Sequence, residues 1–187
     1  MMREDEATRE TLAVESGAAK AGDGTGDGVA HGSADGRTRG GLYLEDLWVG
    51  QRFRSGSLTV DEAEVKAFAA RYDPQPFHLD AAAAEASLFR GLAASGWHTA
   101  ALSMRLFLDG GAPIAGGVIG ASGELAWPRP TRPGDTLTVE SEVLAVVPSK
   151  SRPDRGHATL RSQTLNQAGE PVQIFTMNLI VPRRPPA

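Results

Sequence analysis

An aspartate and a histidine, Asp73 and His78, stand five residues apart with Pro74 and Pro76 between them. Proline fixes its own φ angle, donates no backbone hydrogen bond and pushes the preceding residue away from helical geometry. We therefore predict a stiff, non-helical turn over residues 72–80 that holds both side chains in place. A carboxylate and an imidazole fixed in this way can position one water molecule for acid/base chemistry.

The residue types alone leave simpler roles open for the same side chains. Asp73 stands before a proline and would serve as a turn former, because aspartate readily hydrogen-bonds the backbone of a turn. His78 would serve as a hydrogen-bonded loop histidine. Asp80 precedes an alanine-rich stretch, so a helix-capping role is favoured over a role as an acid.

Composition excludes several classes of chemistry. The 187 residues carry a net charge of −4 with a pI near 5.6, which gives no electrostatic reason to expect binding to nucleic acid or to an anionic membrane. The absence of cysteine excludes disulfides, thiolate nucleophiles and cysteine-ligated zinc, and it agrees with a reducing compartment. Hydrophobic residues make up 41% of the chain, which is enough to form a core.

The chain divides by composition into a tail and a folded part. Residues 1–40 hold few large apolar side chains, so we expect a disordered N-terminal tail, with one folded domain over residues 41–187. No segment approaches the roughly 18 apolar residues of a membrane span. The charged start, residues 1–6, leads into no apolar stretch, so a secretory signal is not indicated and a cytoplasmic protein is expected.

Two helices and a strand are predicted around the Asp73–His78 turn. A short strand over residues 53–58 leads into a helix that Thr59 and Glu62 would start as a capping box. This helix would end at the Asp73–Pro74 step, and helical spacing predicts its apolar face. The face comprises Val65, Phe68, Ala69 and Tyr72. After the turn, Asp80 can cap a short helix that runs to about Ser87.

A longer helix is predicted over residues 97–108, because apolar residues repeat there at helical spacing. Its apolar positions are Trp97, Ala100, Ala101, Met104, Phe107 and Leu108. Its opposite side offers as polar groups His98, Thr99, Ser103 and Arg105. We expect this helix to be mostly buried. The chain beyond it is rich in predicted strands, which indicates an α+β fold with an antiparallel sheet wrapped around the helix.

Three motifs follow one another along the chain. The first is Asp73-x-x-Pro76-x-His78-x-Asp80, the second is Ser95-Gly96-Trp97-His98, and the third is Trp127-Pro128-Arg129-Pro130-Thr131-Arg132-Pro133-Gly134-Asp135. In this order and spacing they resemble the MaoC-like dehydratases, which include the R-specific enoyl-CoA hydratases. The resemblance covers roughly residues 42–182.

The resemblance implies a fold, a catalytic pair and an assembly. The fold is the hot-dog fold, in which a curved antiparallel sheet wraps a central helix, here residues 97–108. The implied catalytic residues are Asp73 and His78, with the Gly96 N–H polarising the carbonyl of an acyl thioester. A homodimer or an assembly of dimers is implied, with no metal or organic cofactor.

The chain departs from the family at two positions. The family's usual asparagine between the catalytic pair is Gln75 here. A serine found further along the helix in the R-hydratases falls at Met104, with Ser103 one residue off.

Further residues are expected to bind substrate. Ser95 and Gln75 adjoin the catalytic positions, and Arg129 and Arg132 could meet the phosphates of coenzyme A, because arginine suits phosphate geometry. Three more basic residues could share that role, namely Lys150, Arg152 and Arg155.

The implied activity is that of a hydro-lyase, which adds water to the 2,3 double bond of an enoyl-CoA-type substrate or removes it. Two other functions stay open. One is a non-catalytic subunit that binds acyl thioesters. The other is a thioesterase of the same fold, which ranks lower: many such enzymes place a carboxylate on or beside the central helix, and the acid here is Asp109 at its very end.

Overall fold

The computed structural model describes residues 41–186, and the tail expected over residues 1–40 lies outside this range. A short 3-10 helix, η1, precedes four α-helices and five strands. The helices are η1 (Leu44–Asp46), α1 (Glu62–Tyr72), α2 (Pro76–Leu79), α3 (Ala81–Glu85) and α4 (Gly96–Gly110). The strands are β1 (Arg52–Thr59), β2 (Ile119–Ala126), β3 (Thr136–Pro148), β4 (Arg155–Leu165) and β5 (Pro171–Pro182).

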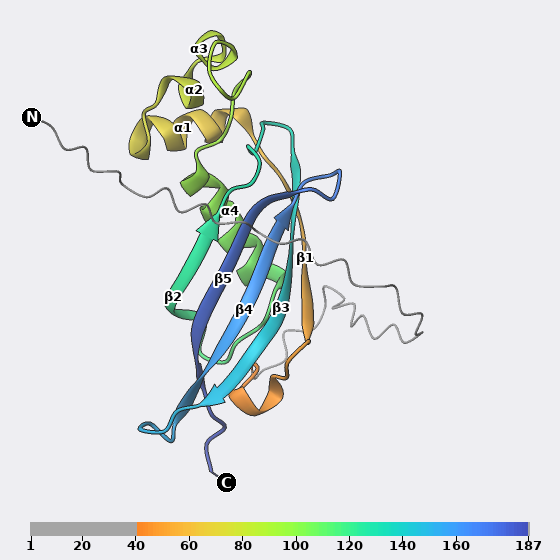
Figure 1. Cartoon of the computed structure of the whole chain (residues 1–187), viewed down its shortest axis with the longest axis vertical. Coiled ribbons are helices and arrows are strands. Elements are labelled where there is room, and N and C mark those ends of the chain that lie inside the picture. The colour runs from red at the N-terminus through yellow and green to blue at the C-terminus, as the bar shows by residue number, and fades with distance from the viewer. Residues whose placement is uncertain (1–40, 187) are drawn as a thin grey trace, which may run out of the picture.

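The strands form one antiparallel sheet in the order β1-β3-β4-β5-β2. Strands β3, β4 and β5 are the longest and follow one another through short turns, whereas β1 and β2 flank them at the two edges. Figure 1 shows α4 running along one face of this sheet. The α+β architecture and the hot-dog fold predicted from the sequence are therefore confirmed.

The core lies between α4 and the sheet. Strand β3 alternates buried and partly exposed residues, and its inward side includes Leu137, Val139 and Val143. Alternation of this kind is what a strand with one buried face requires. Leu106 and Phe107 of α4 belong to the same cluster of buried side chains. The sheet thus holds α4 in place, and with it the residues at the N-terminal end of α4.

The buried face of α4 differs from the predicted one. Three of its polar residues, His98, Thr99 and Ser103, are buried, whereas Trp97 is 63% and Leu108 is 58% exposed. Hydroxyl groups can enter a core where partners are available, and Ser103 donates to the Thr99 carbonyl and shares a hydrogen bond with Thr164 of β4. The expectation that α4 is mostly buried was therefore wrong for its outer face.

Helix α1 begins two residues later than the predicted capping box. Thr59 is the last residue of β1, and the N-cap is Asp61, whose carboxylate accepts a hydrogen bond from the Glu64 N–H. The apolar face holds at Val65 and Ala69, which are fully buried, but Tyr72 is exposed. The predicted end at Asp73 is confirmed, because Asp73 is the C-cap of the helix.

The Asp73–His78 segment is only half non-helical, contrary to the prediction. Asp73 and Gln75 have extended or irregular backbone angles, but Pro76 occupies the first position of the one-turn helix α2, which contains His78. The first turn of a helix tolerates proline because its N–H would have no helical partner there. Asp80 then caps α3 through the Ala83 N–H, as predicted.

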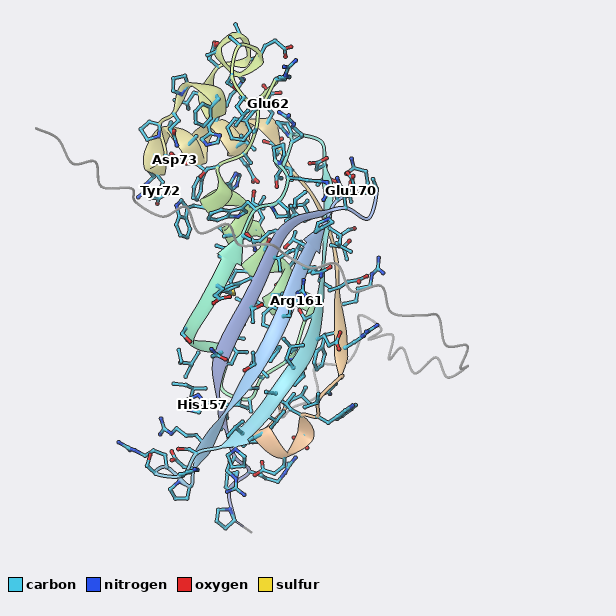
Figure 2. The ribbon with its side chains drawn as sticks, viewed as in Figure 1. Glu62, Tyr72, Asp73, His157, Arg161 and Glu170 are labelled. Atoms are coloured by element: carbon cyan, nitrogen blue, oxygen red, sulfur yellow. The ribbon has the colours of Figure 1, made fainter. Side chains whose placement is uncertain are left out.

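Helices α1, α2 and α3 gather at one end of the sheet, next to the N-terminal end of α4 (Figure 1). The labelled Asp73 lies at this helical end, whereas His157 lies at the opposite end of the molecule (Figure 2). Among the helices of residues 41–186, none combines the length and the apolar character needed to cross a membrane.

Candidate active site

A pocket of about 680 Å³ opens at the helical end of the molecule. Its lining comes from four segments of the chain: the α1–α2 region, the α3–α4 loop, the start of α4, and the loop after β2. The lining residues include Asp73, His78, Gly96, Trp97, Trp127 and Arg132. The pocket thus brings together parts of all three motifs that the sequence analysis singled out.

Asp73 is held by two hydrogen bonds in addition to its place at the end of α1. The Ser95 hydroxyl donates to Asp73 Oδ2 at 2.7 Å, and the Gln75 amide donates to Oδ1 at 2.7 Å. Each carboxylate oxygen therefore has its own donor, and the carboxylate plane is fixed.

These donors also set the charge of the carboxylate. The Ser95 hydrogen bond lowers the pKa of Asp73 below its usual value, with smaller contributions in the same direction from Gln75 and from the nearby His78, while burial opposes them. Hydrogen bonds to a carboxylate favour its ionised form. Asp73 is therefore a carboxylate at neutral pH and can accept a proton.

His78 is buried, at 4% exposure, and its tautomer follows from its partner. Its Nδ1 lies 2.8 Å from the Ala93 carbonyl oxygen, which can only accept a hydrogen bond. Nδ1 therefore carries the proton, and in the neutral ring Nε2 keeps a free lone pair. That Nε2 lies 3.4 Å from Asp73 Oδ2.

The two side chains together present two acceptors at one place. Asp73 Oδ2 and the Nε2 lone pair of neutral His78 cannot hydrogen-bond each other, because neither supplies a proton. A water molecule can satisfy both, because it can donate one hydrogen to each. Such a water would have its oxygen lone pairs directed away from both residues, as a nucleophile requires.

Gly96 begins α4 beside this pair, and among the described residues its N–H has no hydrogen-bond acceptor. The first N–H groups of a helix lack helical partners and lie at its positive end. The space beside the Gly96 Cα is filled by Trp127, because a Cβ there would come within 2.9 Å of the indole ring. Glycine at this position thus lets the indole pack against the backbone and leaves the N–H available to a ligand oxygen.

Trp127 is itself fixed on both sides. Its indole N–H donates to Gln173 Oε1 at 3.0 Å, and Gln173 is buried on β5. Trp97 packs edge-on against it, with ring centroids 5.4 Å apart. The pocket wall next to Gly96 is therefore rigid and aromatic.

Two of the residues expected to bind substrate, Ser95 and Gln75, are hydrogen-bonded to Asp73. Ser95 is fully buried behind Asp73, and its hydroxyl also accepts from the Trp97 N–H as the N-cap of α4. Gln75 lines the pocket, but its amide is bonded to Asp73. Both residues thus contact Asp73 directly.

The basic residues separate into two groups. Arg129 and Arg132 line the pocket, where Arg129 is exposed and lies 3.4 Å from Glu170, and Arg132 is bound to backbone carbonyls. The other three, Lys150, Arg152 and Arg155, lie around the β3–β4 turn, which Figure 1 shows at the end of the sheet opposite α1–α3. Within one chain, these three therefore lie far from the pocket.

Three further residues weighed from the sequence do not line the pocket. Met104 is on the exposed side of α4, and the Ser103 hydroxyl is used by Thr99 and Thr164. Asp109 is exposed and pairs with Arg105 at 2.6 Å, at the end of α4 opposite the pocket. A carboxylate thirteen residues along the helix from Gly96 lies roughly 20 Å away.

Sequence reasoning did not identify the role of Ala93 or of Trp127. Ala93 acts through its backbone carbonyl, for which a side-chain pattern gives no signal. Trp127 was noted as part of a motif, and its proximity to Gly96 depends on the pairing of β2 with β5. Within residues 41–186, no three acidic or histidine side chains gather as a group that could hold a metal ion.

Comparison with protein families gives one matching description, the MaoC like domain, over residues 48–164. This range contains Asp73, His78 and Gly96 and most of the sheet. The chain is also 33% identical to the uncharacterized protein YdeM of Bacillus subtilis over 143 residues, which is 75% of this chain and 97% of that protein.

Solved structures give two informative matches. A MaoC-like dehydratase from Rhodospirillum rubrum is 62% identical with a TM-score of 0.77, over 78% of this chain and 100% of that chain. An (R)-hydratase from A. caviae, involved in PHA biosynthesis, is 33% identical with a TM-score of 0.58, over 75% of this chain and 99% of that chain. Both fold and sequence are thus similar to those of hydratases and dehydratases.

Proposed function

The chain belongs to the MaoC-like dehydratase family, and from this premise we propose that it adds water to the 2,3 double bond of an enoyl thioester and catalyses the reverse dehydration. The observation that carries the proposal is the convergence of Asp73 Oδ2 and His78 Nε2, 3.4 Å apart, in a pocket that also contains Gly96. The similarity to the (R)-hydratase from A. caviae supports the same reaction class.

In the first step, a water held between Asp73 and His78 attacks C3 of the enoyl group. One O–H bond of the water breaks, and its proton passes to the Asp73 carboxylate. The electron pair of the double bond moves toward the thioester, and negative charge gathers on the carbonyl oxygen. The Gly96 N–H donates to that oxygen, and a preorganised donor of this kind can lower a barrier by roughly 3 kcal/mol.

In the second step, the enolate collapses and C2 takes up a proton. That proton is the one that Asp73 accepted from the water. It passes through His78 Nε2 to C2 on the same face of the substrate, so addition is syn and Asp73 returns to its carboxylate form. The net change is one water added and no redox change. Read backwards, the same steps remove water from a 3-hydroxyacyl thioester.

The carrier part of the substrate is a pantetheine thioester in this proposal. Arg129 is exposed at the pocket, where its guanidinium lies 3.4 Å from Glu170 and 3.5 Å from the Pro171 carbonyl, and in this proposal it exchanges these exposed contacts for a phosphate of the carrier. Arginine binds phosphate through its planar fork of donors. Leu88, Trp97 and Trp127 supply apolar side chains to the lining of the same pocket.

We further propose that the protein is a homodimer. Among the described strands, β2 pairs with β5 alone and its other edge is open. The outer face of α4 carries exposed apolar side chains, including Trp97, Met104 and Leu108. An open strand edge beside an exposed apolar stripe favours pairing with a second copy about a twofold axis. Analytical ultracentrifugation of wild type and Leu108→Glu tests the dimer. A wild-type mass of 19.7 kDa, unchanged in Leu108→Glu, would contradict it.

The test of function is an assay with crotonyl-CoA and longer enoyl-CoA esters, followed by loss of the absorbance of the conjugated thioester. Hydration by the wild-type chain, without release of free thiol, is the expected result. Release of thiol without hydration would favour a thioesterase. Binding of the esters without either reaction would favour a non-catalytic acyl-thioester-binding subunit.

A further inference from the structure

Arg132 lies at the pocket, but its guanidinium is occupied by the protein backbone. Nη1 donates to the Gly91 carbonyl at 2.6 Å and to the Leu92 carbonyl at 3.1 Å, while Nη2 donates to the Phe89 carbonyl. Its own backbone N–H is held by the Asp135 carboxylate at 2.7 Å. One side chain thus gathers three carbonyl groups of a single loop.

The loop that Arg132 holds, residues 86–95 between α3 and α4, belongs to no helix or strand, and its first half is tied by turn hydrogen bonds such as that from the Arg90 N–H to the Ser87 carbonyl. Arg90 has a positive φ of 50° and Gly91 one of 132°, so the backbone is bent into conformations that are uncommon for most residues. Such conformations persist where the surroundings impose them. A planar guanidinium with several donors is suited to hold neighbouring carbonyl groups at once.

This loop carries the groups that orient both catalytic side chains. The Ala93 carbonyl accepts from His78 Nδ1 and thereby fixes its tautomer. Ser95, two residues on, donates to Asp73 Oδ2. The Ala94 N–H between them bonds to the Thr131 carbonyl, next to Arg132 in the chain. Any movement of the loop would therefore move the Ala93 carbonyl and the Ser95 hydroxyl, which orient His78 and Asp73.

We propose that Arg132 is a positioning residue, which acts through the 86–95 loop on His78 and Asp73, and that it does not bind the phosphates of the substrate carrier. The inference rests on the proposed hydration for its kinetic consequence. Because Arg132 holds the orienting groups and does not bind the substrate, its loss lowers kcat and leaves KM nearly unchanged. A displacement of about 1 Å in catalytic groups can cost roughly 100-fold in rate.

The kinetic test compares full-length wild type with Arg132→Ala and Arg132→Lys. We expect kcat to fall by at least about tenfold in both variants, because a lysine ammonium cannot reproduce the fork. Added guanidinium ion should restore part of kcat to Arg132→Ala but none to Arg132→Lys. Arg54→Ala, which removes an exposed arginine from an ion pair on β1, is the control and should keep wild-type kcat.

A second variant perturbs the same contact without removing the charge. A Cβ at Gly91 would lie 3.4 Å from Arg132 Nη1, at a φ that disfavours side chains, so Gly91→Ala should lower kcat as well. Gly169→Ala is the matched control, because Gly169 also has a positive φ but has open space around it in the β4–β5 turn. This pair keeps the inference testable if Arg132→Ala folds poorly.

A measurement that does not depend on catalytic turnover separates the role of Arg132 from the proposed function. Nitrogen-15 NMR of the histidine ring reports which nitrogen of His78 carries the proton, with His78→Ala to assign the signal. We expect Nδ1 protonation in wild type and a mixture of tautomers in Arg132→Ala. If wild type shows no hydration, the proposed function fails while this measurement still tests Arg132.

Three outcomes would overturn the inference. In one, kcat and the His78 tautomer are unchanged in Arg132→Ala. In a second, KM rises with kcat unchanged, which would make Arg132 a ligand of the substrate carrier. A loss of kcat shared equally by Arg54→Ala would also contradict it, because the effect would then not depend on the loop.

Discussion

Ser95 Oγ lies 2.7 Å from Asp73 Oδ2 and donates a hydrogen bond to it. The donor comes from the N-cap of α4 and the acceptor from the C-cap of α1, so a single hydrogen bond joins the ends of two helices at the pocket. The bond is the largest cause of the lowered pKa of Asp73. It links the orientation of the carboxylate to its charge.

Replacing Ser95 with alanine should therefore raise the pKa of Asp73 toward its ordinary value and lower kcat. In wild type the carboxylate titrates below 3.8, because its donors stabilise the charged form. Carbon-13 NMR of the Asp73 carboxyl group, assigned with Asp73→Asn, measures the change. The loss of the N-cap should also cost about 1 kcal/mol of stability. Ser103→Ala, a buried serine on the same helix, is the control and should leave the Asp73 titration unchanged.

The lowered pKa of Asp73 also makes the free energy of unfolding depend on pH. A carboxyl group with a lowered pKa contributes stability above its unfolded pKa, and this contribution is lost as the pH falls through the folded value. Ser95→Ala should reduce this acid-sensitive contribution. Urea unfolding at pH 7 and pH 2.5 would reveal it as a smaller loss of stability on acidification than in wild type; an equal loss would argue against the assigned role of the hydrogen bond.

Gly96→Ala should disturb the pocket wall, because the added methyl group would come within 2.9 Å of the Trp127 ring. Relief of such overlap usually costs 1–3 kcal/mol, so we expect roughly 2 kcal/mol of destabilisation together with a fall in kcat. Chemical denaturation and steady-state kinetics measure the two effects. Gly56→Ala is the matched control, because nothing lies within 4 Å of the added Cβ there. Equal behaviour of the two variants would show that the Trp127 contact is not tight.

Secondary structure could largely be predicted from the sequence, because its signals are local. Alternation at Leu137, Val139 and Val143 predicts β3, and the apolar spacing along residues 97–108 predicts α4. The Asp80 cap was correct for the same reason. The predicted cap at Thr59 was wrong because β1 extends through that residue, where it pairs with β3.

The buried face of α4 could not be predicted, because it depends on partners supplied by other elements. Ser103 is buried where Thr164 of β4 can share a hydrogen bond with it, and Trp97 is exposed beside Trp127. The sequence predicted that Asp73, His78 and Gly96 act together, and the structure brings all three into the lining of one pocket. The contribution of the Ala93 carbonyl could not be predicted, because every residue has a carbonyl and only the fold selects one.

His98 should make the protein less stable at mildly acidic pH. It is buried, it stacks on Phe68 with ring centroids 4.7 Å apart, and its Nδ1 has no partner among the described residues. Burial lowers the pKa of His98 below 6.5, while Glu64 opposes the shift. The unfolded chain then binds a proton that the folded chain does not, so stability falls as the pH drops below 6.5.

The measurement compares urea unfolding at pH 7.5 and pH 5.5 for wild type and His98→Gln. The variant should lose less stability between these two values than wild type does. His157→Gln, at an exposed position on β4, should behave as wild type. An unchanged pH dependence in His98→Gln would contradict the prediction.

Thr131 and Thr164 are two buried threonines that should respond in opposite ways to replacement by valine. The Thr131 hydroxyl has no hydrogen-bond partner among the described residues, whereas the Thr164 hydroxyl bonds to Ser103 at 2.7 Å. An unsatisfied buried hydroxyl is costly, so Thr131→Val should stabilise the fold by roughly 1 kcal/mol and Thr164→Val should destabilise it by roughly 1–2 kcal/mol. Urea unfolding measures both; equal signs would contradict the assignment of these hydrogen bonds.

The most direct test of the central claim is a double-mutant comparison at Asp73 and His78. If both residues hold the same water, each single variant, Asp73→Asn or His78→Ala, removes the whole effect of the pair. We expect kcat/KM for enoyl-CoA hydration to fall by roughly 10³ in each and to fall little further in the double variant. Hydration that survives in the double variant at more than a tenth of the wild-type rate, or losses that simply multiply, would contradict the account.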